Sequence, residues 1–253
     1  MSGAQPPAVA PDARVRLNLG AAKTFIPGFA NIDIHERAEI NLDLGKDPLP
    51  FPDGSAGMVV SHHTLEHVPD YLFALKEIHR VLEHDGVLLL SLPYATLTEH
   101  HMVNPYHHHN FNEHSFDFFD PLALKGSAAE DGEVAFRKAL VRFTYMGAFG
   151  IAPRPVRRWT RRHLLNVVRQ FDIALIAIKD PDVPVDIGPE RVRELERQIV
   201  ELKQARTRYP AVAAEVETAV RRTAASPPAG GRALRALRYR RAAILRRYEV
   251  RRD

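Results

Sequence analysis

Short apolar runs alternate with glycine, proline and charged residues over the first ninety residues of the chain. Each run has the length of a buried strand and stops at a turn signal, such as Gly20 after the first run. The five expected strands are Val15–Leu19, Ala30–Ile34, Asn41–Leu44, Met58–Ser61 and Val87–Leu92. Before the last of them, Asp70–Glu83 repeats apolar residues at helical spacing, with Asp70 as the expected N-cap. This alternation predicts a doubly wound parallel sheet, whose ligands bind at the carboxyl ends of the strands.

The pattern becomes less regular after the fifth expected strand. Pro93–Lys125 is rich in histidine and aromatic residues and shows no clear period. A loop of this length inside a compact domain is usually functional, and this one leaves the carboxyl end of a strand. We therefore expect a substrate-binding lid over the ligand site. Beyond it, helices are expected over Val134–Phe149 and Arg162–Gln170, and late strands over Phe171–Lys179.

The character of the chain changes at Pro189. Apolar residues there follow a 3,4,3 spacing with charges between them, which is typical of a short coiled-coil seam. They are Val192, Leu195, Ile199 and Leu202. Further helices are expected over 210–223 and 232–250, on either side of a Pro/Gly linker at 226–231. Because an apolar seam needs burial, we expect a homodimer through these C-terminal helices.

Charge also distinguishes this tail. The formal net charge of the 253 residues is +4, but residues 189–253 hold 17 Lys plus Arg against 8 Asp plus Glu. Their net charge of +9 leaves −5 for residues 1–188. A basic helical tail suits nucleic acid, an anionic membrane surface or an acidic substrate, and a solvated appendage without a partner has the same composition.

Composition excludes several classes of protein. The chain has no cysteine, which excludes disulfides, thiolate metal sites and cysteine nucleophiles. It has no stretch of 18 apolar residues, and residues 1–13 lack the basic and then apolar pattern of a signal peptide. We therefore expect a cytoplasmic protein without a transmembrane segment.

The first two strands carry the pattern of a nucleotide pocket. Gly20 follows the first strand and allows the backbone to approach a ligand closely. Asp33 lies near the end of the second strand, where a carboxylate accepts hydrogen bonds from ribose hydroxyls. An ordinary strand, turn and strand would show the same residues, so the blocks that follow decide between the two interpretations.

These residues resemble class I S-adenosylmethionine-dependent methyltransferases, specifically the type 11 branch that acts on small molecules. Three ordered blocks carry the resemblance: LNLGAAKTFIPGFANIDI, LPFPDGSAGMVVSHHTLEHVPD and ALKEIHRVLEHDGVLLLSLP. The resemblance implies a Rossmann-like α/β fold, with a mostly parallel seven-stranded sheet, and S-adenosylmethionine as cofactor. The expected domains are a lead-in (1–13), a methyltransferase domain (14–188, with the lid at 93–125) and a basic helical extension (189–253).

The resemblance also implies which residues bind the cofactor. They are Leu19, Gly20 and Ala21 under the methionine moiety, Asp33 at the ribose, Asp43 with Leu44 at the adenine, and Ser61 with His62 beside the methionine end. The chain departs from the family at two places. Ala22 stands where a second glycine is usual, and the segment 23–29 is too short for a full first helix.

Three polar residues share one helical turn after the fourth expected strand, in the sequence HHTLEHV. They are His63, Glu66 and His67. His63 is the expected catalytic base, because the end of the fourth strand points at the transferred methyl group, and Glu66 is expected to act with it. For His67 we favour a structural role at the start of the turn.

The lid concentrates six histidines, namely His100, His101, His107, His108, His109 and His114. Histidine suits a general base at neutral pH, and His109 is a second candidate for that role. Alternatively, His107, His109, Glu113 and His114 hold a divalent metal, Mg²⁺ or Mn²⁺, that polarises an acceptor hydroxyl. A polar loop that meets only water and backbone is the third interpretation.

Aromatic and polar side chains alternate on the same segment, which suits a sugar ring. The expected substrate-binding residues are Tyr94, Tyr106, His107, His108 and His114. The sequence therefore predicts O-methylation of a carbohydrate or glycosylated metabolite. The alternatives are N- or C-methylation of another small metabolite, and a non-catalytic methyltransferase-fold protein that serves binding or assembly. Nucleic acid is not the expected partner.

Overall fold

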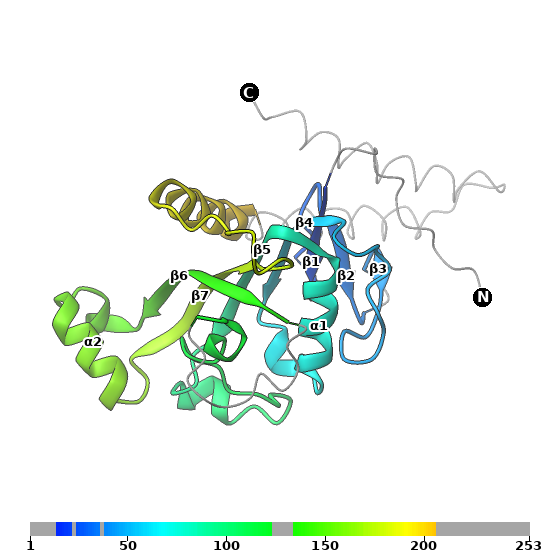
Figure 1. The fold of residues 1–253 in the computed structure, drawn as a ribbon. Helices are drawn as coiled ribbons and strands as arrows, with labels where there is room; N and C mark the ends of the chain where they lie inside the picture. The colour runs from blue at the N-terminus through cyan, green and yellow to red at the C-terminus, as the bar shows by residue number, and fades with distance from the viewer. Residues whose placement is uncertain (1–13, 22–23, 36–37, 123–133, 206–253) are drawn as a thin grey trace, which may run out of the picture.

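A seven-stranded sheet forms the centre of the protein (Figure 1). The computed structural model describes residues 14–21, 24–35, 38–122 and 134–205. The strands, in the spatial order β3-β2-β1-β4-β5-β7-β6, are β1 (Val15–Leu19), β2 (Ala30–Asp33), β3 (Ile40–Asn41), β4 (Ala56–His62), β5 (Leu82–Pro93), β6 (Phe136–Tyr145) and β7 (Val168–Ala177). The first five pair in parallel, and β7 runs antiparallel to both β5 and β6. The predicted Rossmann-like, mostly parallel seven-stranded sheet is confirmed.

One face of the sheet is covered by α1 (Tyr71–Val81). Its carboxylate cap is the predicted one, since Asp70 accepts a hydrogen bond from the amide of Phe73 at 2.9 Å. Leu75 and Ile78 of the helix are fully buried. They share an apolar core with alternate residues of the central strands. The apolar positions that recur at helical spacing in α1 therefore pack against those that recur at strand spacing in the sheet.

The opposite face is covered by the helix at 189–205, drawn in gold in Figure 1. Leu195 and Ile199 are buried in a second core, where they meet strand residues such as Val60 and Leu89. The Lys203 ammonium also donates to the buried carboxylate of Asp172 in β7, at 2.6 Å. The two central residues of the apolar seam that suggested a dimer are therefore buried within the chain, and residues 189–205 pack as part of the sheet domain.

The helix predicted over Val134–Phe149 is wrong, because this segment forms β6 and a short 3-10 helix, η4 (Gly147–Gly150). Strand alternation is hidden in the sequence by a bulge, where the register with β7 shifts between Lys138 and Leu140. One extra residue at this point moves the apolar positions to the other face. The resulting mixed spacing resembles a helical period.

The helix predicted over Arg162–Gln170 is also wrong. The observed helix is α2 (Arg154–His163), and the chain then turns at Asn166, whose φ is 57°. Asparagine tolerates this left-handed conformation better than most residues, and a helix cannot continue through it. β7 starts at Val168 and contains the predicted late strand.

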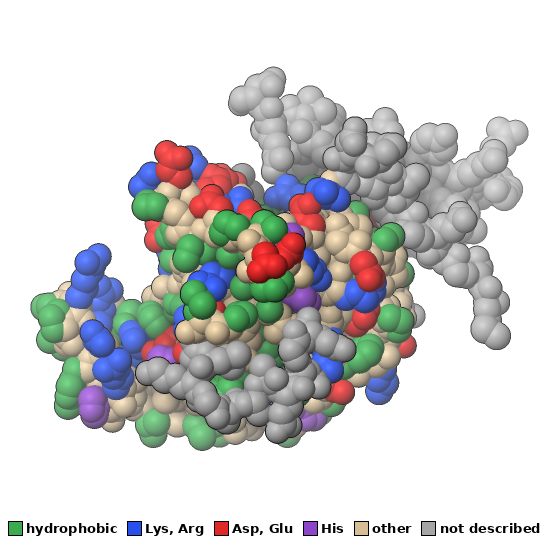
Figure 2. Space-filling model, in the orientation of Figure 1, with side chains coloured by type: hydrophobic (Ala, Val, Ile, Leu, Met, Phe, Trp, Pro, Cys, Tyr) green, Lys and Arg blue, Asp and Glu red, His purple; other side chains and the backbone are tan. Residues whose placement is uncertain are grey.

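The α2 helix lies at the far end of the β6–β7 hairpin, away from the body of the sheet (Figure 1). Figure 2 shows Lys and Arg side chains gathered on this projection. Its basic residues are Arg154, Arg157, Arg158, Arg161 and Arg162. The single tryptophan, Trp159, is 56% exposed and stacks on His163 with ring centroids 4.8 Å apart.

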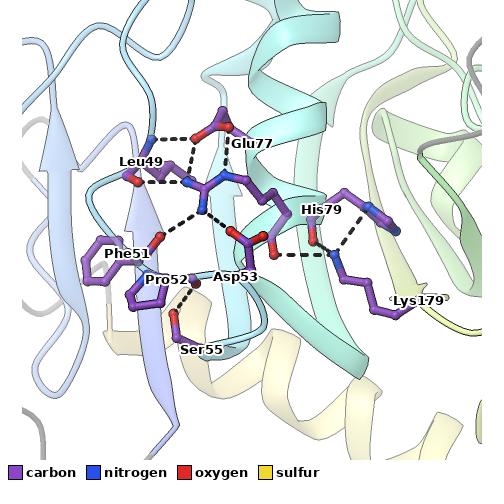
Figure 3. Close-up of polar contacts among 9 residues, drawn as sticks. Leu49, Phe51, Pro52, Asp53, Ser55, Glu77, His79 and Lys179 are labelled. Carbon is purple, nitrogen blue, oxygen red and sulfur yellow. Dashed lines mark hydrogen bonds and ion pairs between the residues drawn. The ribbon is translucent and has the colours of Figure 1, made fainter.

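The guanidinium of Arg80 links the loop between β3 and β4 to α1. Figure 3 shows its labelled partners Leu49, Phe51, Asp53 and Glu77. The guanidinium donates to the carbonyl oxygens of Leu49 and Phe51 at 2.9 and 3.0 Å, and pairs with the carboxylates of Asp53 and Glu77. The hydrogen bond that Arg80 donates to Glu77 is the largest of the contacts that raise the pKa of Arg80. Because these groups precede β4 or end α1, they lie at the amino end of the parallel strands and serve the fold.

The remaining segments link these elements. Short helical turns lie at η1 (Leu65–His67), η2 (Thr98–Met102) and η3 (Asp117–Phe119). None of the described helices is both long and apolar enough to cross a membrane. The predicted lead-in at 1–13, the helices at 210–223 and 232–250 and the linker at 226–231 lie outside the described residues.

Candidate active site at the carboxyl edge of the sheet

The strand register places several of the predicted cofactor residues next to one another at the carboxyl ends of β1, β2 and β4. Leu19 of β1 is paired with Ile32 of β2 and with Ser61 of β4. The residues that follow these three, Gly20, Asp33 and His62, therefore leave the sheet side by side. This edge is where open parallel sheets bind ligands.

Gly20 adopts a φ of 67°, a conformation that side chains rarely allow. A Cβ atom at this position would overlap the side chain of Thr64, which follows β4. The next amide, that of Ala21, donates to the carbonyl of Ile32 at 3.0 Å. The glycine therefore lets β1 turn sharply beneath the residues that follow β4.

Two buried amides, which the sequence analysis missed, hold the loop that replaces a full first helix. Asn18 donates to the side-chain oxygen of Asn31 at 2.8 Å, and both residues are buried. Asn31 also accepts from the amide of Ile26 and donates to the carbonyl of Phe29, each at 2.8 Å. Two polar residues inside apolar strands were the available signal, because a buried amide requires partners.

The two predicted acids differ in their surroundings. Asp33 is half-buried, and one of its oxygens accepts from the His35 amide at 2.8 Å. Asp43 follows β3 and is paired with Lys46 at 2.9 Å. The hydrogen bond from Lys46, followed by that from the Gly45 amide, lowers the pKa of Asp43. Both carboxylates lie at the carboxyl ends of their strands, and that of Asp43 is already paired with a cation.

The side chains at the apolar positions among the predicted cofactor residues point into the core. Leu19 is fully buried and Leu44 is 8% exposed, and both belong to the core on the α1 face. Ser61 is 3% exposed, and its hydroxyl has no hydrogen-bond partner among the described residues. A buried polar atom without a partner beside Gly20 and Asp33 fits a bound polar ligand. The residues present therefore fit S-adenosylmethionine.

His63 and Glu66 form the predicted pair directly after β4. His63 Nδ1 is 3.3 Å from a Glu66 carboxylate oxygen, and His63 Nε2 is 3.3 Å from the side-chain oxygen of Gln170. The His63 side chain is 35% exposed, whereas Glu66 is fully buried. His63 also has a φ of 52°, a strained value for a residue that is neither glycine nor asparagine. The pair therefore combines a reachable imidazole with a buried carboxylate that orients it.

The 93–122 segment docks onto this turn. The His108 amide donates to the Glu66 carbonyl at 2.8 Å, and His67 Nδ1 is 3.1 Å from the Tyr106 carbonyl. These contacts bring His107 to Glu66 and His67, so that one donor atom from each of the three lies within 4.8 Å of the others. Sequence spacing cannot reveal this group, because its members come from two distant segments.

His101 and His107 pack against each other with Nδ1 atoms 2.6 Å apart. Burial lowers the pKa of His101, and the neighbouring His107 lowers it further. Burial, followed by the nearby His67, likewise lowers the pKa of His107. Both rings therefore favour the neutral form, in which one nitrogen keeps a free electron pair.

Tyr94 and Glu113 belong to a different network within the same segment. The buried Tyr94 hydroxyl donates to Glu113 at 2.7 Å, and Arg161 of α2 pairs with the same carboxylate at 3.0 Å. Burial opposes ionisation of Glu113, but the hydrogen bond from Tyr94 and the charge of Arg161 lower its pKa overall. This network joins the 93–122 segment to α2.

The four predicted metal candidates do not form one group among the described residues. His107 lies with Glu66, whereas Glu113 pairs with Arg161. His114 is exposed and pairs with Asp117 at 2.9 Å. His109 Nε2 is 3.0 Å from the carbonyl oxygens of both Val68 and Pro69, which occupies the nitrogen as a donor.

The other two predicted substrate residues are exposed. The Tyr106 side chain is 73% exposed, and His108 also faces solvent. Both lie next to His107 in the stretch that docks onto Glu66.

Residues 30–90 match the family model described as a methyltransferase domain. The matched region runs from the start of β2 into β5 and includes Asp33, Ser61 and His63. This match confirms the predicted class of enzyme, a methyltransferase, for the part of the chain that forms the candidate site. No curated protein sequence matches the chain.

Several solved structures are similar to this chain at low sequence identity. A SAM-dependent methyltransferase from Archaeoglobus fulgidus is 14% identical over 65% of this chain and 86% of its own, with a TM-score of 0.47. A putative methyltransferase from Haloferax volcanii, solved with the Trm112 methyltransferase activator, is 13% identical over 67% of this chain and 84% of that chain, with a TM-score of 0.46. YcgJ from Bacillus subtilis is 16% identical over 66% and 94%, with a TM-score of 0.42. Because these TM-scores are below 0.5, the fold assignment rests on the strand order of this chain.

Proposed function

We propose that the protein is an S-adenosylmethionine-dependent O-methyltransferase that methylates a hydroxyl group of a carbohydrate or glycosylated metabolite. The observation that carries the proposal is the alignment of Gly20, Asp33 and His62 at one level of the sheet, with the His63–Glu66 pair directly beyond. Cofactor residues and a candidate base thus leave adjacent strands together. Methyl transfer depends mainly on holding donor and acceptor in line.

The cofactor-binding part of the proposal assigns a contact to each polar group at the edge. Asp33 accepts hydrogen bonds from ribose hydroxyls, and the Ser61 hydroxyl donates to the methionine end. When bound, S-adenosylmethionine supplies the methyl group: the acceptor oxygen forms a bond to the methyl carbon as the carbon–sulfur bond breaks, and its electron pair remains on sulfur in S-adenosylhomocysteine. Ala21 and Leu44 contribute backbone contacts, since their side chains are buried.

The catalytic part assigns the acceptor proton to His63. Its ring nitrogens face the oxygens of Glu66 and Gln170, and a neutral imidazole can donate to only one of them. With Nδ1–H directed at Glu66, Nε2 has an electron pair that takes the hydroxyl proton. Glu66 thereby orients the ring, as a carboxylate does in other histidine bases. His109 remains the second candidate base.

The acceptor class follows from the exposed part of the 93–122 segment. Tyr106 and His108 combine an open aromatic face with a hydrogen-bonding ring, which suits a sugar. Tyr94 and His114 support this surface through their bonds to Glu113 and Asp117. An amine or carbon acceptor, and a non-catalytic binding role, are the alternatives that the experiments below address.

Calorimetry with S-adenosylhomocysteine tests the cofactor assignment. Asp33→Ala is expected to weaken binding by about tenfold or more, because it removes a charge-assisted hydrogen bond. The matched control is Asp182→Asn, an exposed acid beyond β7 at the opposite end of the sheet. Equal affinities of wild type and Asp33→Ala would reject the proposed site.

A methyl-label acceptor screen, centred on sugars, tests the reaction. His63→Asn is the informative variant, since asparagine tolerates the positive φ of this position but cannot act as a base. It is expected to reduce kcat by about 10²–10⁴-fold with cofactor affinity unchanged. Full turnover by both His63→Asn and His109→Asn would dismiss the base assignment, and methylation of amines alone would replace the hydroxyl acceptor.

A further inference from the structure

We propose that Glu66, His67 and His107 form a binding site for a divalent transition-metal ion, such as Mn²⁺, Co²⁺ or Zn²⁺. One donor atom of each residue lies within 4.8 Å of the other two. Two imidazoles and one carboxylate are a donor set that such ions prefer over Mg²⁺, and three protein ligands leave coordination positions open. The site differs from the group predicted from sequence, with which it shares only His107.

The burial of the Glu66 carboxylate supports a cation site independently of the distances among the three residues. Glu66 is fully buried, and neither of its oxygens has a hydrogen-bond partner among the described residues. The contact at 3.3 Å is with Nδ1 of His63. A buried carboxylate is costly unless it is paired, protonated or bound to a metal. The one contact with His63 involves a single Glu66 oxygen, which leaves the other oxygen open to a cation.

The two imidazoles are oriented as metal ligands usually are. His67 Nδ1 is 3.1 Å from the carbonyl oxygen of Tyr106, so it must carry the hydrogen and leaves the electron pair on Nε2. His107 Nδ1 is likewise 3.0 Å from the carbonyl oxygen of His101. His107 Nε2 is 3.0 Å from the side-chain nitrogen of Asn104, a neutral donor that an ion at this position would displace. A backbone carbonyl on the far nitrogen is the contact that fixes the tautomer of a ligating histidine.

The place of the group suggests its use, which rests on the proposed function. Glu66 follows His62 and His63 at the end of β4, beside the expected methyl group. An ion held there by Glu66, His67 and His107 would polarise the acceptor hydroxyl and make its proton easier to remove. Because His107 comes from the 93–122 segment, the ion would also fasten that segment over the site.

Metal titration of the tag-free protein, stripped with EDTA, tests the site without reference to activity. Mn²⁺ calorimetry and the visible absorption of bound Co²⁺ are expected to show one equivalent. Glu66→Gln and His107→Asn should each weaken binding at least tenfold. His100→Asn, an exposed histidine of the same segment, is the matched control and should bind as wild type does.

Glu66→Gln also separates a metal ligand from a structural residue. Without metal it is expected to keep or raise Tm, since it removes an uncompensated buried charge, whereas a structural carboxylate would lower Tm on replacement. The proposal is overturned if wild type binds no transition ion, or if Glu66→Gln and His107→Asn titrate as wild type does. If the protein binds S-adenosylhomocysteine but no metal, the metal site is refuted and the proposed function stands. If it binds the metal but not S-adenosylhomocysteine, the proposed function is refuted and the metal site stands.

Discussion

Gly20 and Thr64 occupy neighbouring space so closely that a Cβ atom on Gly20 would lie 1.9 Å from the Thr64 hydroxyl oxygen. The contact joins the turn after β1 to the turn after β4. These are the two turns that carry the candidate cofactor residues and the candidate base. Packing between them therefore fixes the relative position of the two groups of candidate residues.

Gly20→Ala is expected to lower the free energy of unfolding by more than the 1–2 kcal/mol that a left-handed alanine costs. The overlap with Thr64 adds to that cost. Thr64→Gly in the same chain should recover the steric part, because even the Thr64 Cβ would lie 2.7 Å from the new atom, but it should not recover the backbone part. Urea unfolding of both variants and the double variant measures the two terms, and an alanine variant as stable as wild type would contradict the contact.

Leu195→Ala is expected to cost about 2–4 kcal/mol, because this residue is fully buried against the sheet. Val200→Ala on the same helix is the control and should cost less than about 0.5–1 kcal/mol, since Val200 is 41% exposed. The measurement is chemical denaturation. Similar small losses in both variants would mean that the helix at 189–205 is an independent appendage.

Asn166, at the junction of α2, β7 and the 93–122 segment, contributes to stability through a side-chain hydrogen bond and through its tolerance of a left-handed backbone. Its side-chain oxygen accepts from the Thr98 amide at 2.7 Å, and its φ is positive. Asn166→Gly keeps the conformation and loses the bond, at about 1–2 kcal/mol, whereas Asn166→Ala adds a further 1–2 kcal/mol of backbone strain. Thermal unfolding ranks the three proteins, and glycine ranking below alanine would refute this explanation.

Stability is expected to fall as the pH drops below about 6.5, in part because of His79. Burial, followed by the charge of Lys179, lowers the pKa of this histidine in the folded protein. Below the unfolded pKa of about 6.5 the unfolded chain binds more protons, so protonation favours unfolding until the folded pKa is reached. His79→Gln should flatten the dependence of Tm on pH between 5 and 7, whereas His100→Asn should leave it unchanged. If Tm depends on pH as steeply in His79→Gln as in the wild type, His79 does not contribute to the loss of stability at low pH.

The sequence by itself determined most of the first half of the fold and the edge that carries the candidate site. The exception is β3 (Ile40–Asn41), which shares only Asn41 with the strand predicted over Asn41–Leu44. Strand β1 has its predicted bounds, and α1 begins at its predicted cap, because apolar period, glycine and capping residues act within a few positions along the chain. The same local signals indicated Gly20 and Asp33. The resemblance then extended them to a methyltransferase, which the family match confirmed over residues 30–90.

Only the tertiary structure decided what covers each apolar surface and which polar groups meet. Periodicity shows that Leu195 needs burial but not that the sheet, rather than a second chain, provides it. A single bulge in β6 changed the spacing of its apolar residues enough that the sequence predicted a helix. The meeting of Glu66 with His107 depends on how a long irregular segment folds back over β4, and contacts between distant residues leave no spacing in the sequence from which they can be read.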